Sequence, residues 1–173
     1  MRKSVTIKDL EKNPFFKCFQ TRELLVRQFA WAIPNAKAIR EIAKLGPFIE
    51  IGAGNGYWAY LLQQAGVQVK PYDIFHSKKT WTKVTKGGPD KLLKALDKYN
   101  LILCWPPYNS PMALKSLKNF KGKYVVYVGE GHGGCTADAG FHKKINSEYK
   151  LVKKIKIPQY PNIHDRVFIY ERC

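Results

Sequence analysis

The chain has 173 residues, enough for one domain with a single sizeable hydrophobic core. Hydrophobic residues make up 45% of it, which excludes an intrinsically disordered protein. Lysine and arginine number 30 against 13 aspartate and glutamate, a formal net charge of +17. This excess favours a polyanionic partner, above all nucleic acid, over anionic membranes and small phosphorylated substrates. The alternative is a lysine-rich surface that serves only solvation.

Targeting and redox features indicate an intracellular protein. No apolar run approaches the roughly 20 residues of a membrane-spanning helix, and the N-terminus lacks the apolar segment of a secretory signal. The cysteines are scattered, as expected for reduced thiols: they are Cys18, Cys104, Cys135 and Cys173. We expect a cytoplasmic monomer that does not bind membranes. His132 and Cys135 have the spacing of half a zinc site, but no second ligand pair exists, so we expect no metal.

Hydrophobic spacing in the first half of the chain predicts two helices, a strand, a glycine turn, a third helix and a second strand. Their ranges are 19–33, 36–45, 48–51, 52–56, 57–65 and 67–72, after a polar arm at 1–17. Pro34 ends the first helix, and Asp73 ends the second strand.

In the second half, an irregular segment at 74–88 holds one short strand around 81–85. Helices and strands then alternate. We expect helices at 89–99, 111–120 and 139–149, and strands at 100–104 and 123–128, with a long loop at 129–138. The end of the chain, 149–160 and 165–172, reads as two strands joined by a proline-rich turn.

This alternation predicts an α/β fold, in which a mostly parallel sheet carries helices on both faces. The last two strands are joined by too few residues for a helical crossover, so they must form an antiparallel hairpin. We expect a single domain over 1–173, with an N-terminal arm and helices at 1–45 and the core at 46–173.

The stretch "EIGAGNGYWAYLL" carries the strongest functional signal. A strand leads into Gly52-Ala53-Gly54-Asn55-Gly56, and a helix follows at once. Glycines there allow positive φ and a close approach of the backbone to a ligand. Asp73 follows at the spacing where an acidic side chain meets ribose hydroxyls in nucleotide-binding sheets. The alternative is a tight turn that binds nothing.

The glycine pattern also limits the cofactor. In the dinucleotide fingerprint G-x-G-x-x-G the third glycine falls on Tyr57, and no G-K-[ST] of a phosphate-binding loop follows. "EIGAGNG" resembles motif I of class I S-adenosylmethionine (SAM)-dependent methyltransferases. The resemblance implies a Rossmann-like, seven-stranded sheet of order 3-2-1-4-5-7-6 with strand 7 antiparallel. It implies SAM as cofactor, bound by Glu50, Gly52, Ala53, Gly54, Gly56, Asp73, Cys104 and Trp105.

"LILCWPPYN" lies at the end of the fourth core strand and resembles motif IV of amino-methyltransferases, [DNS]-P-P-[YFW]. In that family the polar residue and a proline carbonyl accept hydrogen bonds from the target amine, and the aromatic residue stacks on the base. The resemblance implies catalytic roles for Trp105, Pro106 and Tyr108, and substrate contacts for Tyr108 and Asn109. Trp105 departs from the family at the polar position, which leaves the backbone carbonyls of Trp105 and Pro106. The alternative is a rigid Pro-Pro turn.

"FQTRELL" is similar to the F-x-T-P-x-x-L pattern that precedes motif I in one amino-methyltransferase class. The resemblance implies that Thr21 lies near the carboxylate end of the cofactor, although Arg22 replaces the proline. From Val26 onward, "AWAIP", "LCWPPY", "VYVGEGHGGCTAD" and "IPQYPNIHDRVFIY" resemble small class I methyltransferases of bacteria, fungi and viruses.

The function we predict is SAM-dependent methylation of nucleic acid, at a base amine or, less favoured, a ribose oxygen. RNA is favoured over DNA because no target-recognition domain is visible and a base in a duplex must be flipped out. Glu130 and His132 are placed on the substrate side, Glu130 as a catalytic residue. The aromatic candidates for base stacking are Tyr57, Trp58, Trp81, Trp105 and Tyr108, and the favoured alternative for each is packing in the core. Alternatives are a cap-type 2′-O-ribose methyltransferase with an unusual set around Glu130, a small-molecule methyltransferase, and a noncatalytic SAM- or RNA-binding module.

Overall fold

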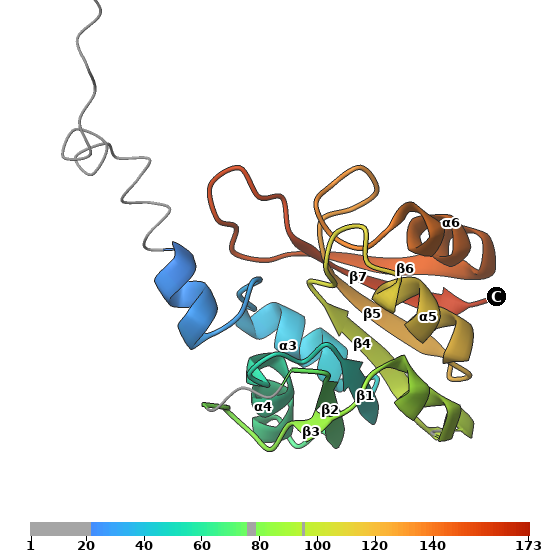
Figure 1. Ribbon diagram of the computed structural model, residues 1–173, viewed down its shortest axis with the longest axis horizontal. Coiled ribbons are helices and arrows are strands. Elements are labelled where there is room, and N and C mark those ends of the chain that lie inside the picture. Colours follow the sequence, from blue (N-terminus) through green and yellow to red (C-terminus); the bar gives the residue numbers. More distant parts are fainter. Residues whose placement is uncertain (1–21, 76–78, 95) are drawn as a thin grey trace, which may run out of the picture.

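The computed structural model describes residues 22–75, 79–94 and 96–173, and they form a seven-stranded sheet of order β3-β2-β1-β4-β5-β7-β6 (Figure 1). The strands are β1 (Phe48–Ile51), β2 (Val69–Asp73), β3 (Thr85–Lys86), β4 (Asn100–Cys104), β5 (Tyr124–Gly129), β6 (Tyr149–Lys156) and β7 (Arg166–Arg172). The predicted strand order, including the antiparallel strand 7, is confirmed.

Strand direction determines where a site is formed. β1 pairs in parallel with β2 and β4, and β4 pairs in parallel with β5, so the carboxyl ends of these four strands share one edge of the sheet. Ligands bind at that edge in open α/β sheets, where the strand order reverses between β1 and β4. β7 runs antiparallel to β5 and β6, which brings the β6–β7 loop to the same edge.

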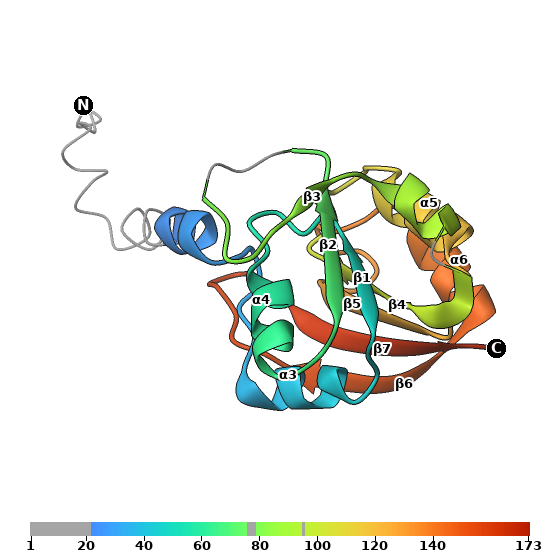
Figure 2. The same ribbon diagram turned by 90° about the horizontal axis from the view of Figure 1, so that it is seen from below.

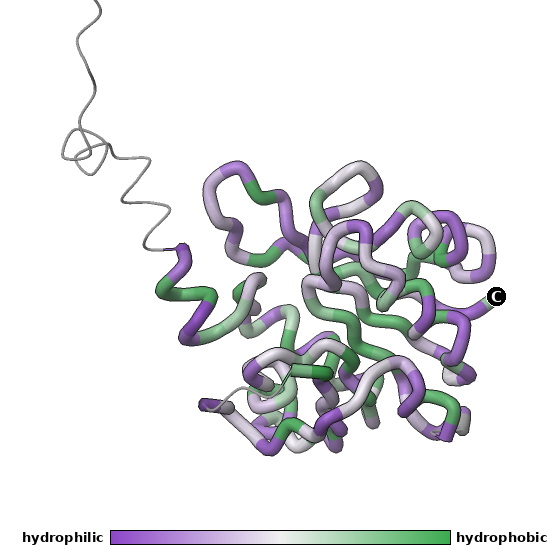
Figure 3. Tube along the Cα trace, viewed as in Figure 1, coloured by the Kyte–Doolittle hydropathy of each residue, from purple (hydrophilic) through white to green (hydrophobic). Residues whose placement is uncertain are grey.

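Helices cover both faces of the sheet (Figure 2). On one face lie α3 (Ala36–Ala43) and α4 (Tyr57–Gln64), and on the other lie α5 (Met112–Asn119) and α6 (Ala139–Glu148). The alternation along β1 explains the two cores, because Phe48 packs under α3 and α4 while Ile49 and Ile51 pack under α5 and α6. Apolar residues accordingly concentrate in the central strands (Figure 3).

Three elements differ from the sequence prediction. The first described helix covers 22–28 and ends before Ile33, because the Trp58 indole N–H donates to the Ala32 carbonyl (2.9 Å) and draws this segment into the core. The range 89–99 forms two 3₁₀ helices, η1 (Pro89–Lys94) and η2 (Leu96–Lys98), in place of an α-helix. β3 is only Thr85–Lys86. No helix within the described ranges is long and apolar enough to cross a membrane.

Candidate functional site

The glycine turn after β1 has the backbone geometry that the sequence predicts. Gly52, Gly54 and Gly56 have φ of +76°, +57° and +78°, a region that other residues rarely adopt. A Cβ on Gly56 would lie 2.9 Å from Val84 Cγ2, so this glycine also permits close packing. α4 begins directly after Gly56, and the turn therefore presents backbone N–H groups beside a helix N-terminus.

Asp73, at the end of β2, holds the glycine turn in place. Its Oδ2 accepts a hydrogen bond from the Gly54 N–H (2.8 Å), and its Oδ1 accepts one from the Phe75 N–H (2.8 Å). Hydrogen bonds from backbone N–H groups to a carboxylate are short and strong because one partner carries a full charge. Asp73 thus fixes the shape of the turn, and its ribose contact remains a prediction.

Glu50 is a buried carboxyl group below the turn. Only 1% of the residue is exposed, and Oε2 has no hydrogen-bond partner among the residues that the structure describes. Burial raises the pKa of Glu50 to about 8, and the charge of Asp73 adds to this, although a hydrogen bond from the backbone of Ala59 opposes it. In the free protein at neutral pH Glu50 is therefore mostly neutral, and a positive charge nearby would ionise it.

A cavity of about 360 Å³ lies over these groups, and we call it the glycine-turn cavity. Its volume falls within the range of small-molecule sites. The residues predicted to bind SAM that line it are Glu50, Gly52, Ala53, Gly54, Asp73, Cys104 and Trp105. Trp58, a predicted stacking residue, lines it too. Gly56 does not line it, and Thr21 lies outside the described residues. Residues of the segment 26–31, among them Trp31, also line it and were missed by the sequence analysis.

Cys104 ends β4 between two carboxyl groups. Burial raises its pKa well above the ordinary value, and the charges of Glu50 and Asp165 raise it further. Its thiol therefore stays protonated and is a poor nucleophile. Cys104 lines the glycine-turn cavity and is also influenced by Asp165, so the end of β4 lies near both the cavity and the loop that carries Asp165.

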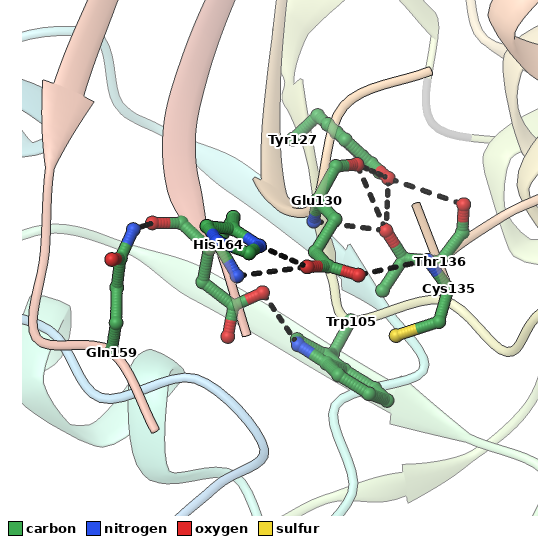
Figure 4. Close-up of polar contacts among 8 residues, drawn as sticks. Trp105, Tyr127, Glu130, Cys135, Thr136, Gln159 and His164 are labelled. Atoms are coloured by element: carbon green, nitrogen blue, oxygen red, sulfur yellow. Dashed lines mark hydrogen bonds and ion pairs between the residues drawn. The ribbon is translucent and has the colours of Figure 1, made fainter. Parts of the chain in front are cut away.

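Trp105 opens the segment 105–108, which we call the WPPY loop, in a strained conformation. Its φ is +50°, an uncommon value for a bulky residue, and such strain is concentrated at functional sites. The Trp105 N–H donates to the Val128 carbonyl (2.7 Å), and the indole N–H donates to Asp165 Oδ1 (2.9 Å; Figure 4). Motif IV of amino-methyltransferases has a polar residue at the position of Trp105. In this chain the carboxylate of Asp165, from the β6–β7 loop, lies beside that position.

The rest of the WPPY loop is held by residues 136–137. The Pro106 carbonyl accepts a hydrogen bond from the Ala137 N–H (2.9 Å), which uses one of its two acceptor positions. Asn109 has φ +53°, is exposed, and lines neither of the cavities beside the loop. Tyr108 is 62% exposed. Of the predicted amine acceptors, the Pro106 carbonyl is thus partly occupied.

Glu130 lies below a second cavity, of about 590 Å³, which we call the His132 cavity. Glu130 Oε2 accepts from the Cys135 N–H (2.9 Å) and Oε1 from the His164 N–H (2.8 Å; Figure 4). Burial raises the pKa of Glu130, but these hydrogen bonds outweigh it and the net pKa lies below the ordinary value. Such a carboxylate joins the 130–135 loop to the β6–β7 loop and accepts protons poorly. His132 and Tyr108 line the same cavity.

The predicted stacking residues have different environments. Trp58 is 2% exposed and belongs to the core. Tyr57 and Trp81 pack on each other (centroids 5.1 Å apart) and on Phe29. Trp105 stacks on Trp31, with centroids 4.8 Å apart and planes at 14°. Tyr108, 62% exposed against 38% for Trp81, is the most exposed ring of the five and the best placed to stack on a ligand at the surface.

No protein-family model matches the chain, and no curated protein matches it in sequence. Solved structures do match in fold. Magnesium protoporphyrin IX methyltransferase from Synechocystis PCC 6803, with bound SAM, has a TM-score of 0.58 at 11% identity, over 100% of both chains. 1,6-Didemethyltoxoflavin-N1-methyltransferase from Burkholderia thailandensis, with S-adenosylhomocysteine, has a TM-score of 0.58 at 13% identity, over 92% of this chain and 90% of that one. The chain therefore has the Rossmann-like fold of SAM-dependent methyltransferases.

Proposed function

We propose that the protein is a SAM-dependent methyltransferase that acts on nucleic acid, with RNA favoured and a base amine as the preferred acceptor. One observation carries the proposal: the glycine-turn cavity joins Glu50, the turn and Asp73 to Trp105 at the end of β4. The cofactor half and the acceptor half of a methyltransferase must meet in this way, because methyl transfer is an in-line displacement between two bound reactants.

The residues present fit SAM. Oε2 of Glu50 is buried beneath the cavity without a partner among the described residues, and it suits a cationic ligand group. Asp73 lines the cavity and its carboxylate could accept hydrogen bonds from ribose hydroxyls, and the turn has the positive φ values that admit a ligand near the backbone. The related folds crystallised with SAM or S-adenosylhomocysteine support the same cofactor.

The chain contributes binding and orientation to the reaction. When bound, SAM supplies the activated methyl group. Glu50 and Asp73 would hold the donor in the cavity, which Trp105 also lines at the end of β4. An exocyclic amine needs only acceptors that orient its N–H bonds, whereas a ribose hydroxyl needs a positioned group that takes its proton. Neither cavity is lined by a lysine from the described part of the chain, which favours the amine over 2′-O chemistry.

Charge supports nucleic acid as the acceptor. The net charge is +17, and exposed lysines continue along the edge strand β6, at Lys150, Lys153, Lys154 and Lys156. Arg27, whose side chain is 80% exposed, lines the glycine-turn cavity. These cations would hold phosphates while a base enters the cavity that Arg27 lines.

The test is transfer of a labelled methyl group from SAM to single-stranded RNA, DNA and small nitrogen heterocycles. We expect transfer to RNA that falls steeply as salt increases, because phosphate contacts release counterions. Digestion of the product to nucleosides then identifies the methylated atom. Asp73→Ala, which loosens the cofactor cavity, is the inactive control.

Other outcomes would replace the proposal. The minimal size of the domain also suits a small-molecule methyltransferase, and transfer restricted to small acceptors would establish that function. SAM binding in calorimetry without transfer to any acceptor would identify a noncatalytic binding module. A ribose-methylated product would identify the 2′-O enzyme.

A further inference from the structure

Arg22 is the first described residue of the helix at 22–28, and its guanidinium lies among three aromatic rings from distant parts of the chain. The guanidinium carbon is 5.5 Å from the ring centroid of Trp31, 5.7 Å from that of Trp105 and 5.5 Å from that of Tyr160. We call these three rings the Arg22 cage. Aromatic rings at such distances attract planar cations, and this arrangement is used to recognise cationic ligands.

The cage contains buried polar atoms that lack partners. Nε of Arg22, the Tyr160 hydroxyl and Oδ2 of Asp165 have no hydrogen-bond partner within the described ranges. Asp165 is 0% exposed, and of its two carboxylate oxygens only Oδ1 accepts a hydrogen bond within the described ranges, from the Trp105 indole. Unpartnered buried polar groups are rare in native proteins. Three of them around one aromatic cage indicate a binding place for a polar ligand. Arg22 occupies this place but leaves the three atoms without hydrogen bonds.

The cage adjoins the glycine-turn cavity. Trp31 and Trp105 line that cavity and also form two sides of the cage. A further cavity of about 340 Å³ is lined by Arg22, Trp31 and residues of the helix at 22–28. The cage thus lies where an acceptor would meet the donor, and a cavity beside Arg22 provides a route to it.

We propose that the Arg22 cage is the acceptor-base pocket of this protein, and that Arg22 occupies it until an unpaired nucleobase displaces it. This inference rests on the proposed function and names the residues of its acceptor site. A guanidinium and the amine-bearing edge of adenine or cytosine are both planar and both carry N–H donors, so the same rings and carboxylate suit both. Asp165 then supplies an acceptor oxygen in place of the polar side chain that motif IV has at the position of Trp105.

The helix at 22–28 is anchored at its other end, which limits the movement that displacement requires. The Gln28 carbonyl accepts hydrogen bonds from the Trp81 indole (2.8 Å) and the Asn55 side chain (3.3 Å). Opening the cage needs a new Arg22 rotamer or a shift of the first turn, while Gln28 stays in place. The apparent affinity for the nucleobase is then lowered, because only the fraction of molecules with an open cage can bind it.

The experiment compares Arg22→Gln with Arg40→Gln, an exposed arginine on α3 whose loss removes the same charge. With S-adenosylhomocysteine saturating the cofactor cavity, the Kd for a short single-stranded RNA of mixed sequence is measured by fluorescence anisotropy. Methyl transfer from SAM to the same RNA is measured in parallel. We expect Arg22→Gln to tighten RNA binding about fivefold and to speed transfer, because the pocket is already open. Arg40→Gln should weaken binding slightly, as loss of a cation near phosphates does.

Asp165→Asn tests the carboxylate. The amide oxygen keeps the Trp105 hydrogen bond, but the amide N–H₂ repels the incoming amine, so transfer should fall at least about tenfold with SAM affinity unchanged. If that variant does not fold, Tyr160→Phe keeps the ring and should raise the KM for RNA several-fold. Equal effects of Arg22→Gln and Arg40→Gln, in a protein that methylates RNA, would overturn the inference and leave the proposed function intact. No transfer to RNA by any variant would overturn both.

Discussion

In the proposed site, Glu50, the glycine turn and Asp73 make up the cofactor half and lie within one strand–helix–strand unit, whereas the acceptor half would combine Trp31, Trp105 and Asp165 from three separate segments. The first half is fixed by local hydrogen bonds, such as that from Gly54 to Asp73. The second depends on contacts such as Trp105 to Asp165, 60 residues apart in sequence. A change in the first half should therefore alter cofactor binding, whereas a change at Asp165, which does not line the glycine-turn cavity, should alter acceptor chemistry alone.

Asp73→Ala tests the cofactor half and should have the largest effect. It removes the acceptors for the Gly54 and Phe75 N–H groups, so the turn loses its fixed shape together with the expected ribose contact. We expect SAM affinity in calorimetry to fall by about a hundredfold or more. Asp97→Ala, at an exposed position in η2, is the control and should leave the affinity unchanged. Unchanged affinity in Asp73→Ala would show that the cofactor lies elsewhere.

Glu50 predicts a pH dependence in the same half. Burial raises its pKa to about 8, so a proton must leave Glu50 before its carboxylate can pair with a cationic ligand. Ionisation increases with pH, and SAM affinity should therefore rise about fiftyfold between about pH 6 and about pH 8. Glu50→Gln should bind SAM more weakly and without this dependence. A flat profile in the unaltered protein would remove Glu50 from the cofactor site.

The same contrast explains how much the sequence could predict. The turn could be predicted from Gly52, Gly54 and Asp73. Their roles depend only on backbone conformation and on neighbours in one supersecondary unit. The strand order was likewise predictable, because the family that motif I resembles has one sheet topology and this chain shares it. Asp165 reads as an ordinary turn residue until the hairpin places it against Trp105. Its only sequence signal is an acidic residue at the start of the strand that follows a proline-rich loop.

Element ends were less predictable for the same physical reason. The helix at 19–33 was extended too far because Ala32 continues a helical spacing, yet Ala32 is buried against Trp58 outside the helix. At 89–99 the leucine spacing indicated an α-helix. The Lys91 N–H instead bonds the Gly88 carbonyl (3.0 Å), three residues back, and the segment forms 3₁₀ turns. Tertiary contacts decide such details, and a local pattern does not contain them.

Tyr108→Ala tests, by a change on the acceptor side, whether the acceptor half and the cofactor half act independently. The ring is 62% exposed beside the His132 cavity, and loss of base stacking should raise the KM for RNA by about tenfold. The Kd for SAM should not change, because Tyr108 does not line the glycine-turn cavity. Tyr108→Phe keeps the stacking face and should behave like the unaltered protein. A weaker SAM complex in Tyr108→Ala would mean that the two halves are coupled.

The smallest effect is expected outside both halves, at Glu41 on α3. Glu41 Oε2 pairs with Lys153 of β6 (2.6 Å) and Oε1 with Lys44 (2.7 Å), and these hydrogen bonds lower the pKa of Glu41 to about 2. A lowered pKa means that the stabilisation is present above the ordinary pKa of 4.5 and is lost as the pH falls toward 2. The pair is near the surface and screened, so Glu41→Gln should lower Tm by only about 2 °C at neutral pH and by less in acid or high salt. SAM affinity should remain unchanged, and a change in it would show that α3 and β6 transmit effects to the glycine-turn cavity. RNA affinity should rise slightly, because Lys153 loses its carboxylate partner and becomes available to phosphates.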